Sequence, residues 1–358
     1  MRYRFNLFLV VFISCSLLHA EEDERRRGVT PMAAPYYTPD TGWGIGAYVV
    51  TWFRPDPDSP FTTPDEISFY AACTEKKQAF FVILPDIYFR DGGLKLSGRC
   101  EVNKYPTAFW GVGPDTDNER KEIYTPVETW GDMTLLFRGW RGFYAGPMLH
   151  YRFSRISDIE EGGIIETTGI EGGDGTREIG AGLSFQYDTR DSIFYPLRGL
   201  FIEGKGVFNR EEFTSEYSFS RFDLDARWFA GITGEHVLAF QLRAGAAAGD
   251  VPLQSLCGIG GHQIMRGYMT GRYLDRSSAA VQGEYRFPVI WRFAGVIFAA
   301  AGEVQEKPSD YNTGDIHYSG GGGVRFVLDR SQHIAARLDC GVDDEGTANF
   351  YFLMKEAF

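Results

Sequence analysis

Strict alternation of apolar and polar side chains over long segments limits most strongly what this chain can fold into. The alternation runs through residues 94–102, 183–190, 220–228 and 334–340. In the third segment, arginine or aspartate alternates with phenylalanine, leucine, alanine and tryptophan. Successive side chains of a β-strand point to opposite faces, so this pattern predicts strands with one apolar and one polar face.

The first twenty residues have the features of a secretory leader. Arg2 and Arg4 precede an apolar stretch over residues 5–18, and a suitable cleavage position follows Ala20. The apolar stretch is too short to cross a membrane as a helix, and the charged run EEDERRR follows it. We therefore predict a signal peptide over residues 1–20.

A short polar segment over residues 21–28 separates this leader from the first predicted strand, and the remaining chain, 29–358, reads as one domain. A lipoprotein leader that uses Cys15 is the weaker alternative, because Phe12 fits that pattern badly. The longest later apolar run, residues 293–302, is too short for a membrane helix. The mature chain is therefore either water-soluble or crosses the membrane as strands.

The composition and the strand lengths favour strands that cross a membrane. The chain has 43 Gly, 29 Phe, 19 Tyr and 7 Trp, yet its mean hydropathy is −0.23, as expected when only alternate residues meet lipid. A soluble β-sandwich shows the same alternation, but the predicted strands have the length that tilted strands need to span a bilayer. The chain also ends on an aromatic run, and its apolar positions form a C-terminal barrel signal: Phe350, Phe352, Met354 and Phe358.

Sixteen strands are predicted, an even number that fits a closed single-chain barrel. We therefore predict an all-β fold, a single transmembrane antiparallel β-barrel. The predicted strands cover residues 29–38, 42–53, 64–74, 78–88, 93–103, 127–139, 142–153, 177–189, 199–209, 215–229, 235–247, 278–288, 293–304, 317–328, 333–342 and 348–358.

Charges of both signs on the polar faces suit a water-filled lumen, where arginine and aspartate on adjacent strands can pair. The net charge of −12 argues against nucleic acid as a partner. The predicted lumen charges are Asp188, Arg190, Arg221, Asp223, Asp225, Arg227, Arg337 and Asp339.

The sequence predicts no catalytic site, no metal site and no cofactor. Cys73, Cys100, Cys257 and Cys340 have no metal-ligand spacing, and we expect no disulfide among them. The chain contains no GxSxG motif, and its histidines are scattered. His262 is the one that merits a mutation, because it lies beside the loop motif described next.

Several motifs resemble those of the bacterial surface antigen family, the superfamily of BamA- and TamA-type outer-membrane barrels. They are the turn PDTG with its Gly-rich strand from Tyr36, the segment YDTRDSIFYPLRG over 187–199, and GGHQIMRGYMTGRYLDR over 260–276. The segment YPTAFWGVG over 105–113 and the run GGGVRF near the end also match. The resemblance covers nearly all of the mature chain.

The resemblance implies that the long loop folds back into the barrel and is locked there. The residue matching the family's loop arginine is Arg266, with Gly267 allowing a sharp turn and Tyr268 packing beside it. The matching acid on the next strand is Glu284. The family's second carboxylate is replaced by Ala300, which predicts a simpler lock in this chain.

The resemblance also implies a function. We expect a non-enzymatic outer-membrane barrel of a Gram-negative (diderm) bacterium that assists insertion or translocation of proteins or lipids through a lateral seam and the lumen. It would be a barrel-only form without POTRA modules. A passive porin-like channel or a structural surface antigen is the alternative, and a lipolytic enzyme is the least favoured. Expected partners are outer-membrane lipid and lipopolysaccharide, client membrane proteins or lipids, and a second copy in a homodimer.

Overall fold

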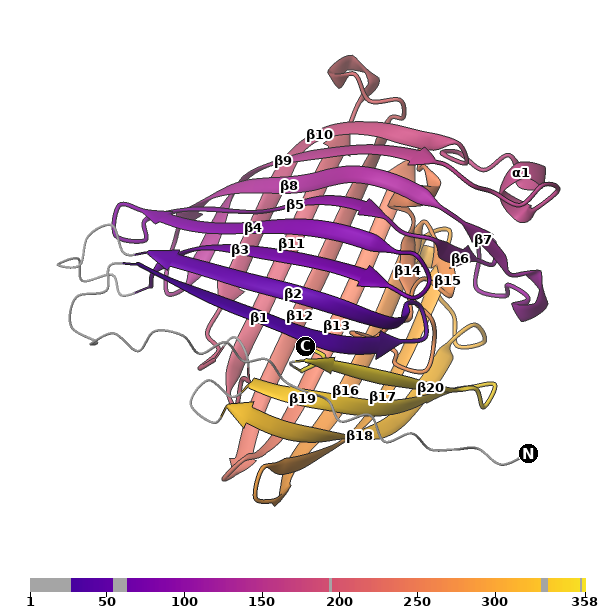
Figure 1. The fold of residues 1–358 in the computed structure, drawn as a ribbon. Helices are drawn as coiled ribbons and strands as arrows, with labels where there is room; N and C mark the ends of the chain where they lie inside the picture. The colour runs from indigo at the N-terminus through magenta and orange to yellow at the C-terminus, as the bar shows by residue number, and fades with distance from the viewer. Residues whose placement is uncertain (1–26, 54–62, 193–194, 330–333, 355) are drawn as a thin grey trace.

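The described part of the chain forms a closed antiparallel β-barrel of sixteen strands, as the sequence predicted (Figure 1). The computed structural model describes residues 27–53, 63–192, 195–329, 334–354 and 356–358. The predicted signal peptide over residues 1–20 therefore lies outside the described residues. No helix in the described part of the chain has both the length and the apolar character needed to cross a membrane.

The barrel strands follow one another around the wall in chain order, and the last strand meets the first. They are β1 (Arg27–Thr38), β2 (Gly42–Phe53), β3 (Asp65–Thr74), β4 (Ala79–Phe89), β5 (Leu94–Lys104), β8 (Pro126–Arg138), β9 (Phe143–Ile156), β10 (Gly175–Asp188), β11 (Gly199–Asn209), β12 (Phe219–Thr233), β13 (His236–Gly249), β16 (Ser277–Ile290), β17 (Phe293–Gln305), β18 (His317–Asp329), β19 (Ile334–Asp343) and β20 (Ala348–Met354).

Short elements in the connections are not part of the barrel sheet. Two are small hairpins, β6–β7 and β14–β15, which form sheets of their own. Their bounds, with those of the helices, are β6 (Thr107–Phe109), η1 (Asn118–Arg120), β7 (Glu122–Tyr124), α1 (Ile164–Thr168), η2 (Glu211–Phe213), η3 (Leu253–Ser255), β14 (Cys257–Ile259), β15 (Tyr273–Asp275) and η4 (Pro308–Asp310).

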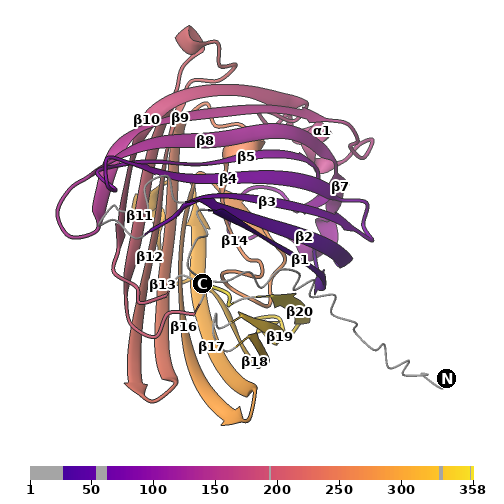
Figure 2. The ribbon, with the colours of Figure 1, turned by 60° about the vertical axis from the view of Figure 1, so that its left-hand side comes forward.

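The final strand is shorter than predicted. β20 ends at Met354, whereas the sequence pattern predicted a strand through Phe358. Its apolar alternation continues as far as Met354, with Phe350 54% exposed on the outer face. Phe358 is buried instead, and the mark of the C-terminus lies inside the barrel outline in both ribbon views (Figures 1 and 2). The prediction that Phe358 belongs to the last strand is therefore wrong, because the chain leaves the wall before reaching it.

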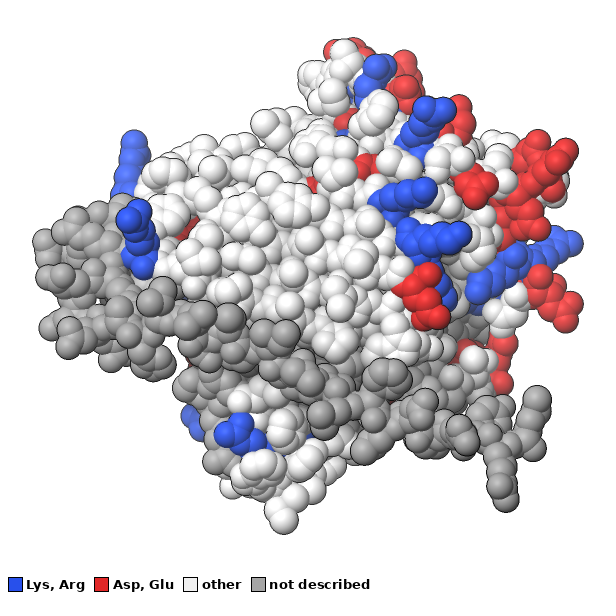
Figure 3. All heavy atoms as spheres, viewed as in Figure 1, with Lys and Arg blue, Asp and Glu red and all other residues white. Residues whose placement is uncertain are grey.

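The outer wall is a broad apolar belt, and the charges gather at its two ends (Figure 3). Trp228 and Phe240 are register partners and are 51% and 45% exposed on the outer face. The next register pair, Arg227 with Gln241, belongs to the lumen face. This is the arrangement that alternation produces when lipid covers one side of a strand.

The two ends of the barrel differ in the length of their connections. The β5–β8, β9–β10 and β13–β16 connections, which hold the hairpins and α1, all leave from one end (Figure 1). The opposite end has tight turns such as β8–β9, β12–β13 and β16–β17. Outer-membrane barrels have short periplasmic turns and longer extracellular loops. The end with the long connections is therefore the extracellular one.

Candidate functional site: the inward loop and the barrel seam

The β13–β16 connection folds into the barrel, where its hairpin β14–β15 is enclosed by the wall (Figure 2). The turn at its tip is tight against β19. Gly267 has a φ of +128°, and a Cβ at this position would lie 2.9 Å from the carbonyl carbon of Val342. Only glycine combines that backbone angle with so close an approach, so the Arg-Gly-Tyr motif allows the loop to reach the inner wall.

Arg266 lies at the centre of this contact and is fully buried. Its Nη2 donates to Glu284 of β16, and its Nη1 donates to Asp339 of β19 at 2.7 Å. The guanidinium also lies 3.6 Å from the centre of the Phe298 ring. A planar guanidinium suits this combination of two carboxylates and an aromatic face.

The expectation of a simpler arrangement, based on Ala300, is wrong. A second buried carboxylate contacts Arg266, but it comes from Asp339 on β19 instead of from β17. The sequence pattern had placed Asp339 on the lumen face without identifying its partner. Which strand faces the loop across the lumen depends on closure of the barrel, and the local sequence does not contain that information.

Further arginines surround these two carboxylates. Arg286 donates to Glu284 at 3.0 Å, Arg325 donates to Asp339, and Arg337 lies 3.3 Å from Asp339. All of these side chains are buried. Buried charges are costly unless they are paired, so β16, β18, β19 and the loop tip are joined through one ionic network.

The C-terminal tail joins the same network from inside the lumen. Arg325 also binds Glu356 at 2.8 Å, and Arg286 donates to the main-chain oxygen of Phe358 at 3.1 Å. The Phe358 ring lies 6.2 Å from that of Phe229 on β12, and the Arg286 guanidinium lies over both rings. The tail is therefore held by charge and by aromatic packing together.

The loop main chain also reaches the last strand. The Tyr351 hydroxyl accepts from the Gly267 N–H and donates to the Tyr268 carbonyl, each at 3.0 Å. Asn349 donates to the carbonyl oxygen of Gly267. Tyr268 donates from its own hydroxyl to the Tyr318 carbonyl at 3.0 Å. These bonds attach the loop tip to β20 and β18.

On the other side of the seam, the loop contacts the β1–β2 turn. The Asp40 carboxylate accepts from the Thr270 N–H at 2.8 Å and from its hydroxyl at 3.1 Å. Burial raises the pKa of Asp40, and the two hydrogen bonds from Thr270 oppose that shift. The sequence shows Asp40 only as a member of the PDTG turn and assigns it no partner, because aspartate after proline is common in ordinary turns. The loop therefore bonds to both edges where the barrel closes.

The closure itself is weakly paired. Among the described residues, β1 and β20 share a single register pair, Tyr37 with Phe352, whereas β1 and β2 pair along all twelve residues of β1. On the lipid side, Trp43 packs 5.4 Å from the Tyr37 ring and 6.3 Å from the Phe352 ring. Aromatic packing thus supports this junction where ladder hydrogen bonds are few.

The other predicted lumen charges pair mainly along their own strands. Arg221 contacts Asp223 at 2.9 Å, and Arg227 contacts Asp225 at 2.6 Å. Arg190, just beyond β10, contacts Asp188 in the same way at 2.7 Å. In these three pairs the partners are two residues apart in the chain and do not lie on adjacent strands. Side chains two apart on a strand share a face, so a long arginine reaches its own neighbour.

A polar chamber of about 360 Å³ lies in the lumen beside these pairs. His150 projects into it between two carboxylates, 2.7 Å from Asp132 and 3.2 Å from Glu178. Ser255 donates to Glu178 at 2.9 Å. The serine is bonded to a carboxylate and not to the histidine, so these groups do not form the hydroxyl–imidazole pair of an activated nucleophile.

In the described residues no group of three or more histidine, cysteine, aspartate or glutamate side chains could hold a metal ion.

His262 lies in the loop beside the ionic network, and its surroundings indicate a structural role. Burial, together with Arg337, Arg243 and Arg266, lowers its pKa to about 4. Its carbonyl accepts from Arg337 at 3.1 Å. A histidine held neutral and surrounded by guanidinium groups is a poor general base at neutral pH.

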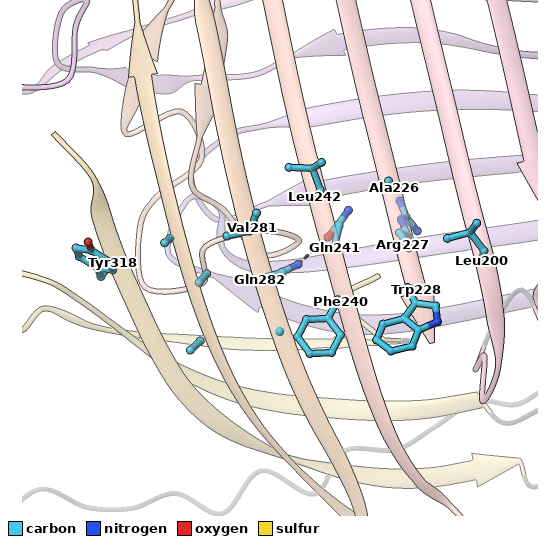
Figure 4. A pocket seen from close by; sticks show the side chains of 14 residues that line it. Leu200, Ala226, Arg227, Trp228, Phe240, Gln241, Leu242, Val281, Gln282 and Tyr318 are labelled. Atoms are coloured by element: carbon cyan, nitrogen blue, oxygen red, sulfur yellow. Dashed lines mark hydrogen bonds between the residues drawn. The ribbon is translucent and has the colours of Figure 1, made fainter. Parts of the chain in front are cut away.

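A shallow groove of about 560 Å³ lies on the lipid-facing wall (Figure 4). Trp228, Phe240 and Val281 line it, while Gln282 donates to Gln241 at 2.7 Å on the lumen side of the same strands (Figure 4). Acyl chains of the bilayer suffice to cover such a surface, so the groove does not indicate a separate ligand.

Extracellular connections pack over the mouth of the barrel. Phe109, Tyr124, Ile165 and Leu253 form one buried apolar cluster drawn from three different connections. The buried Glu122 accepts from the Ile165 N–H at 3.0 Å and so caps the start of α1. The extracellular mouth is therefore covered by connections that pack against one another.

Comparison with known proteins gives the family and the fold. The model of the Omp85 superfamily domain matches residues 63–358. No curated protein matches. Among solved structures, BamA from Haemophilus ducreyi lacking POTRA domains 1–3 is similar with a TM-score of 0.63 and 12% identity, over 93% of this chain and 70% of that one.

Two further structures are CdiB proteins. CdiB from Acinetobacter baumannii has a TM-score of 0.58 at 12% identity, and CdiB from Escherichia coli has 0.59 at 10%. Each similarity covers 93% of this chain but only 60% and 63% of the CdiB chains. At these identities the likeness concerns the barrel fold.

Proposed function

Because the chain belongs to the Omp85 superfamily and is an outer-membrane barrel of a Gram-negative bacterium, we propose that it assists insertion or translocation of proteins or lipids through the seam between β1 and β20. The single register pair between Tyr37 and Phe352 is the observation that carries the proposal. A seam with so few ladder hydrogen bonds costs less to open than any other junction of the wall.

Prolines in β1 support a weak seam. The register with β2 continues unbroken past Pro31 and Pro35. A proline is tolerated in a strand where its nitrogen points away from the neighbouring strand. The missing N–H groups therefore point to the seam side of β1. By the register of Tyr37 with Phe352, Pro35 lies opposite Met354 at the end of β20, where it removes a donor that a closed seam would use, and Pro31 lies beyond that end.

The inward loop acts in this proposal as the lock of the barrel. Arg266, Gly267, Tyr268 and Glu284 hold the loop tip to the wall, and Asp339 supplies the second carboxylate. Because Thr270 and Tyr351 bond the loop to both sides of the seam, loop and seam would move together. The client would be a membrane protein or a lipid, and the chain would act without catalysis.

A passive pore is the less favoured alternative. The lumen contains the loop and the C-terminal tail, and extracellular connections pack over one mouth. Conductance in planar bilayers separates the two functions, since a porin gives large and stable open levels.

A disulfide across the seam tests the proposal. In a background with Cys73, Cys100, Cys257 and Cys340 replaced by alanine, Tyr37→Cys with Phe352→Cys joins register partners of the seam. The matched control, Ala47→Cys with Ala71→Cys, joins register partners of β2 and β3.

The readouts are two rates in phosphatidylethanolamine–phosphatidylglycerol vesicles: folding of an added unfolded outer-membrane barrel, and transfer of a headgroup-labelled lipid between leaflets. We expect the oxidised seam variant to lose the acceleration and to regain it with reductant, while the control keeps it. An oxidised seam variant as active as the control would rule out lateral opening. If the unlinked protein accelerates neither rate, the assembly function itself is wrong.

A further inference from the structure

Three basic side chains lie on the lipid-facing side of the wall near its extracellular end. Lys104 is the last residue of β5, Arg155 lies near the end of β9, and Arg177 lies near the start of β10. Each is exposed. Each shares its strand face with an exposed apolar residue two positions away, and these residues are Val102, Phe153 and Ile179.

The register places the three cations side by side. Lys104 and Arg155 both pair with Val127 of β8, one from each side. Their Cα atoms are therefore about 10 Å apart, twice the spacing of adjacent strands. Arg177 pairs with Phe153, two residues from Arg155, which puts the two arginines roughly 7–8 Å apart on one face.

Few protein groups compete for these cations. Of the salt bridges among described residues, none involves Lys104, Arg155 or Arg177. Arg177 donates from Nε to the Thr214 carbonyl at 2.9 Å, while Glu216 accepts from its main-chain N–H at 2.9 Å. The Nε bond fixes the direction of the guanidinium and leaves its Nη groups available for a ligand.

The cations lie where the apolar belt ends. In Figure 3 the blue side chains near the extracellular end border the white belt of the wall. Long basic side chains at such a border lay their aliphatic stems along apolar surface and extend their charged ends into the headgroup layer.

We propose that Lys104, Arg155 and Arg177 form a binding site for the phosphate groups of a lipid in the outer leaflet. Ammonium and guanidinium groups bind phosphate through charge-assisted hydrogen bonds. The lipid source follows from the placement, because the three side chains share a strand face with residues that contact acyl chains. The site is independent of the seam, and it would fix the height and tilt of the extracellular end of the barrel.

The test measures lipid binding by the full-length protein in detergent. The probe is bisphosphorylated lipid A, and its binding is quantified by native mass spectrometry against the same lipid with its phosphates removed. We expect Lys104→Gln, Arg155→Gln and Arg177→Gln together to weaken binding by about tenfold or more, since each cation near an anionic lipid surface favours binding by about fivefold.

The matched control removes three cations at the other end. Arg90→Gln, Arg138→Gln and Arg141→Gln change exposed residues on the β4–β5 turn, at the end of β8 and on the β8–β9 turn, and they alter the net charge equally. The control should stay within about twofold of the unchanged protein. Equal losses in both variants, or equal binding of the phosphorylated and dephosphorylated lipid, would overturn the proposal.

Folding of each variant is checked by its change in electrophoretic mobility on heating. If the triple variant does not fold, the single changes Arg155→Gln and Arg177→Gln test the site instead. Each should weaken the binding of lipid A by about threefold to fivefold. Unchanged binding in both single variants would equally overturn the site. Because the readout is lipid binding, the result does not depend on whether the seam opens.

Discussion

Replacing Asp339 by asparagine should be among the most damaging single changes to the barrel. Asparagine keeps the shape of the side chain but removes its charge, and Asp339 contacts three guanidinium groups. Arg266 retains Glu284, and Arg325 retains Glu356. Arg337 retains no carboxylate among the described residues, only the carbonyl of His262.

The size of the effect follows from that unpaired charge. Removing one partner of a buried ion pair costs about 3–5 kcal/mol, so we expect the free energy of unfolding to fall by about 4 kcal/mol. It is measured by urea titration in phospholipid vesicles, with tryptophan fluorescence as the signal. Adding Arg337→Met removes the unpaired charge and should restore about half of the loss.

The matched control is Asp225→Asn, which breaks the Arg227 pair in a partly solvated part of the lumen. The two side chains are 17% and 25% exposed, so its loss should be about 1 kcal/mol. If Asp339→Asn costs no more than Asp225→Asn, the network is effectively hydrated and the reasoning about buried charge is wrong.

Three further predictions concern the loop. Arg266→Ala should lower the abundance and heat resistance of the folded barrel; exchanging the charges of Arg266 and Glu284 should not rescue it, because the new acid would face Asp339. Burial raises the pKa of Asp40 above its ordinary 3.8. The stability that Asp40 contributes is therefore fully present below pH 3.8 and is lost as pH rises through its raised pKa in the folded protein. Asp40→Asn should remove this pH dependence from urea titrations. Gly267→Ala should cost about 1–3 kcal/mol or more from its backbone angle alone, and unchanged protease resistance of the loop would contradict the close contact with β19.

The sequence by itself determined the wall of the barrel. The alternation of apolar and polar residues is a local property, because neighbouring side chains of a strand always point to opposite faces. It therefore located all sixteen strands, and the largest errors were four residues, as at β12, which was predicted from 215 and begins at Phe219. The Arg-Gly-Tyr motif also indicated a buried arginine in the loop, through its resemblance to the motif of the surface antigen family.

Only the tertiary structure decided which groups meet inside. Asp339 lies 73 residues from Arg266 in the chain, and Asp40 lies 230 residues from Thr270. The inward turn of Phe358 was likewise hidden, because its partners Phe229 and Arg286 are on distant strands. Such contacts depend on which strands face each other across the lumen once the barrel has closed. The alternation of apolar and polar residues along a strand does not contain that information.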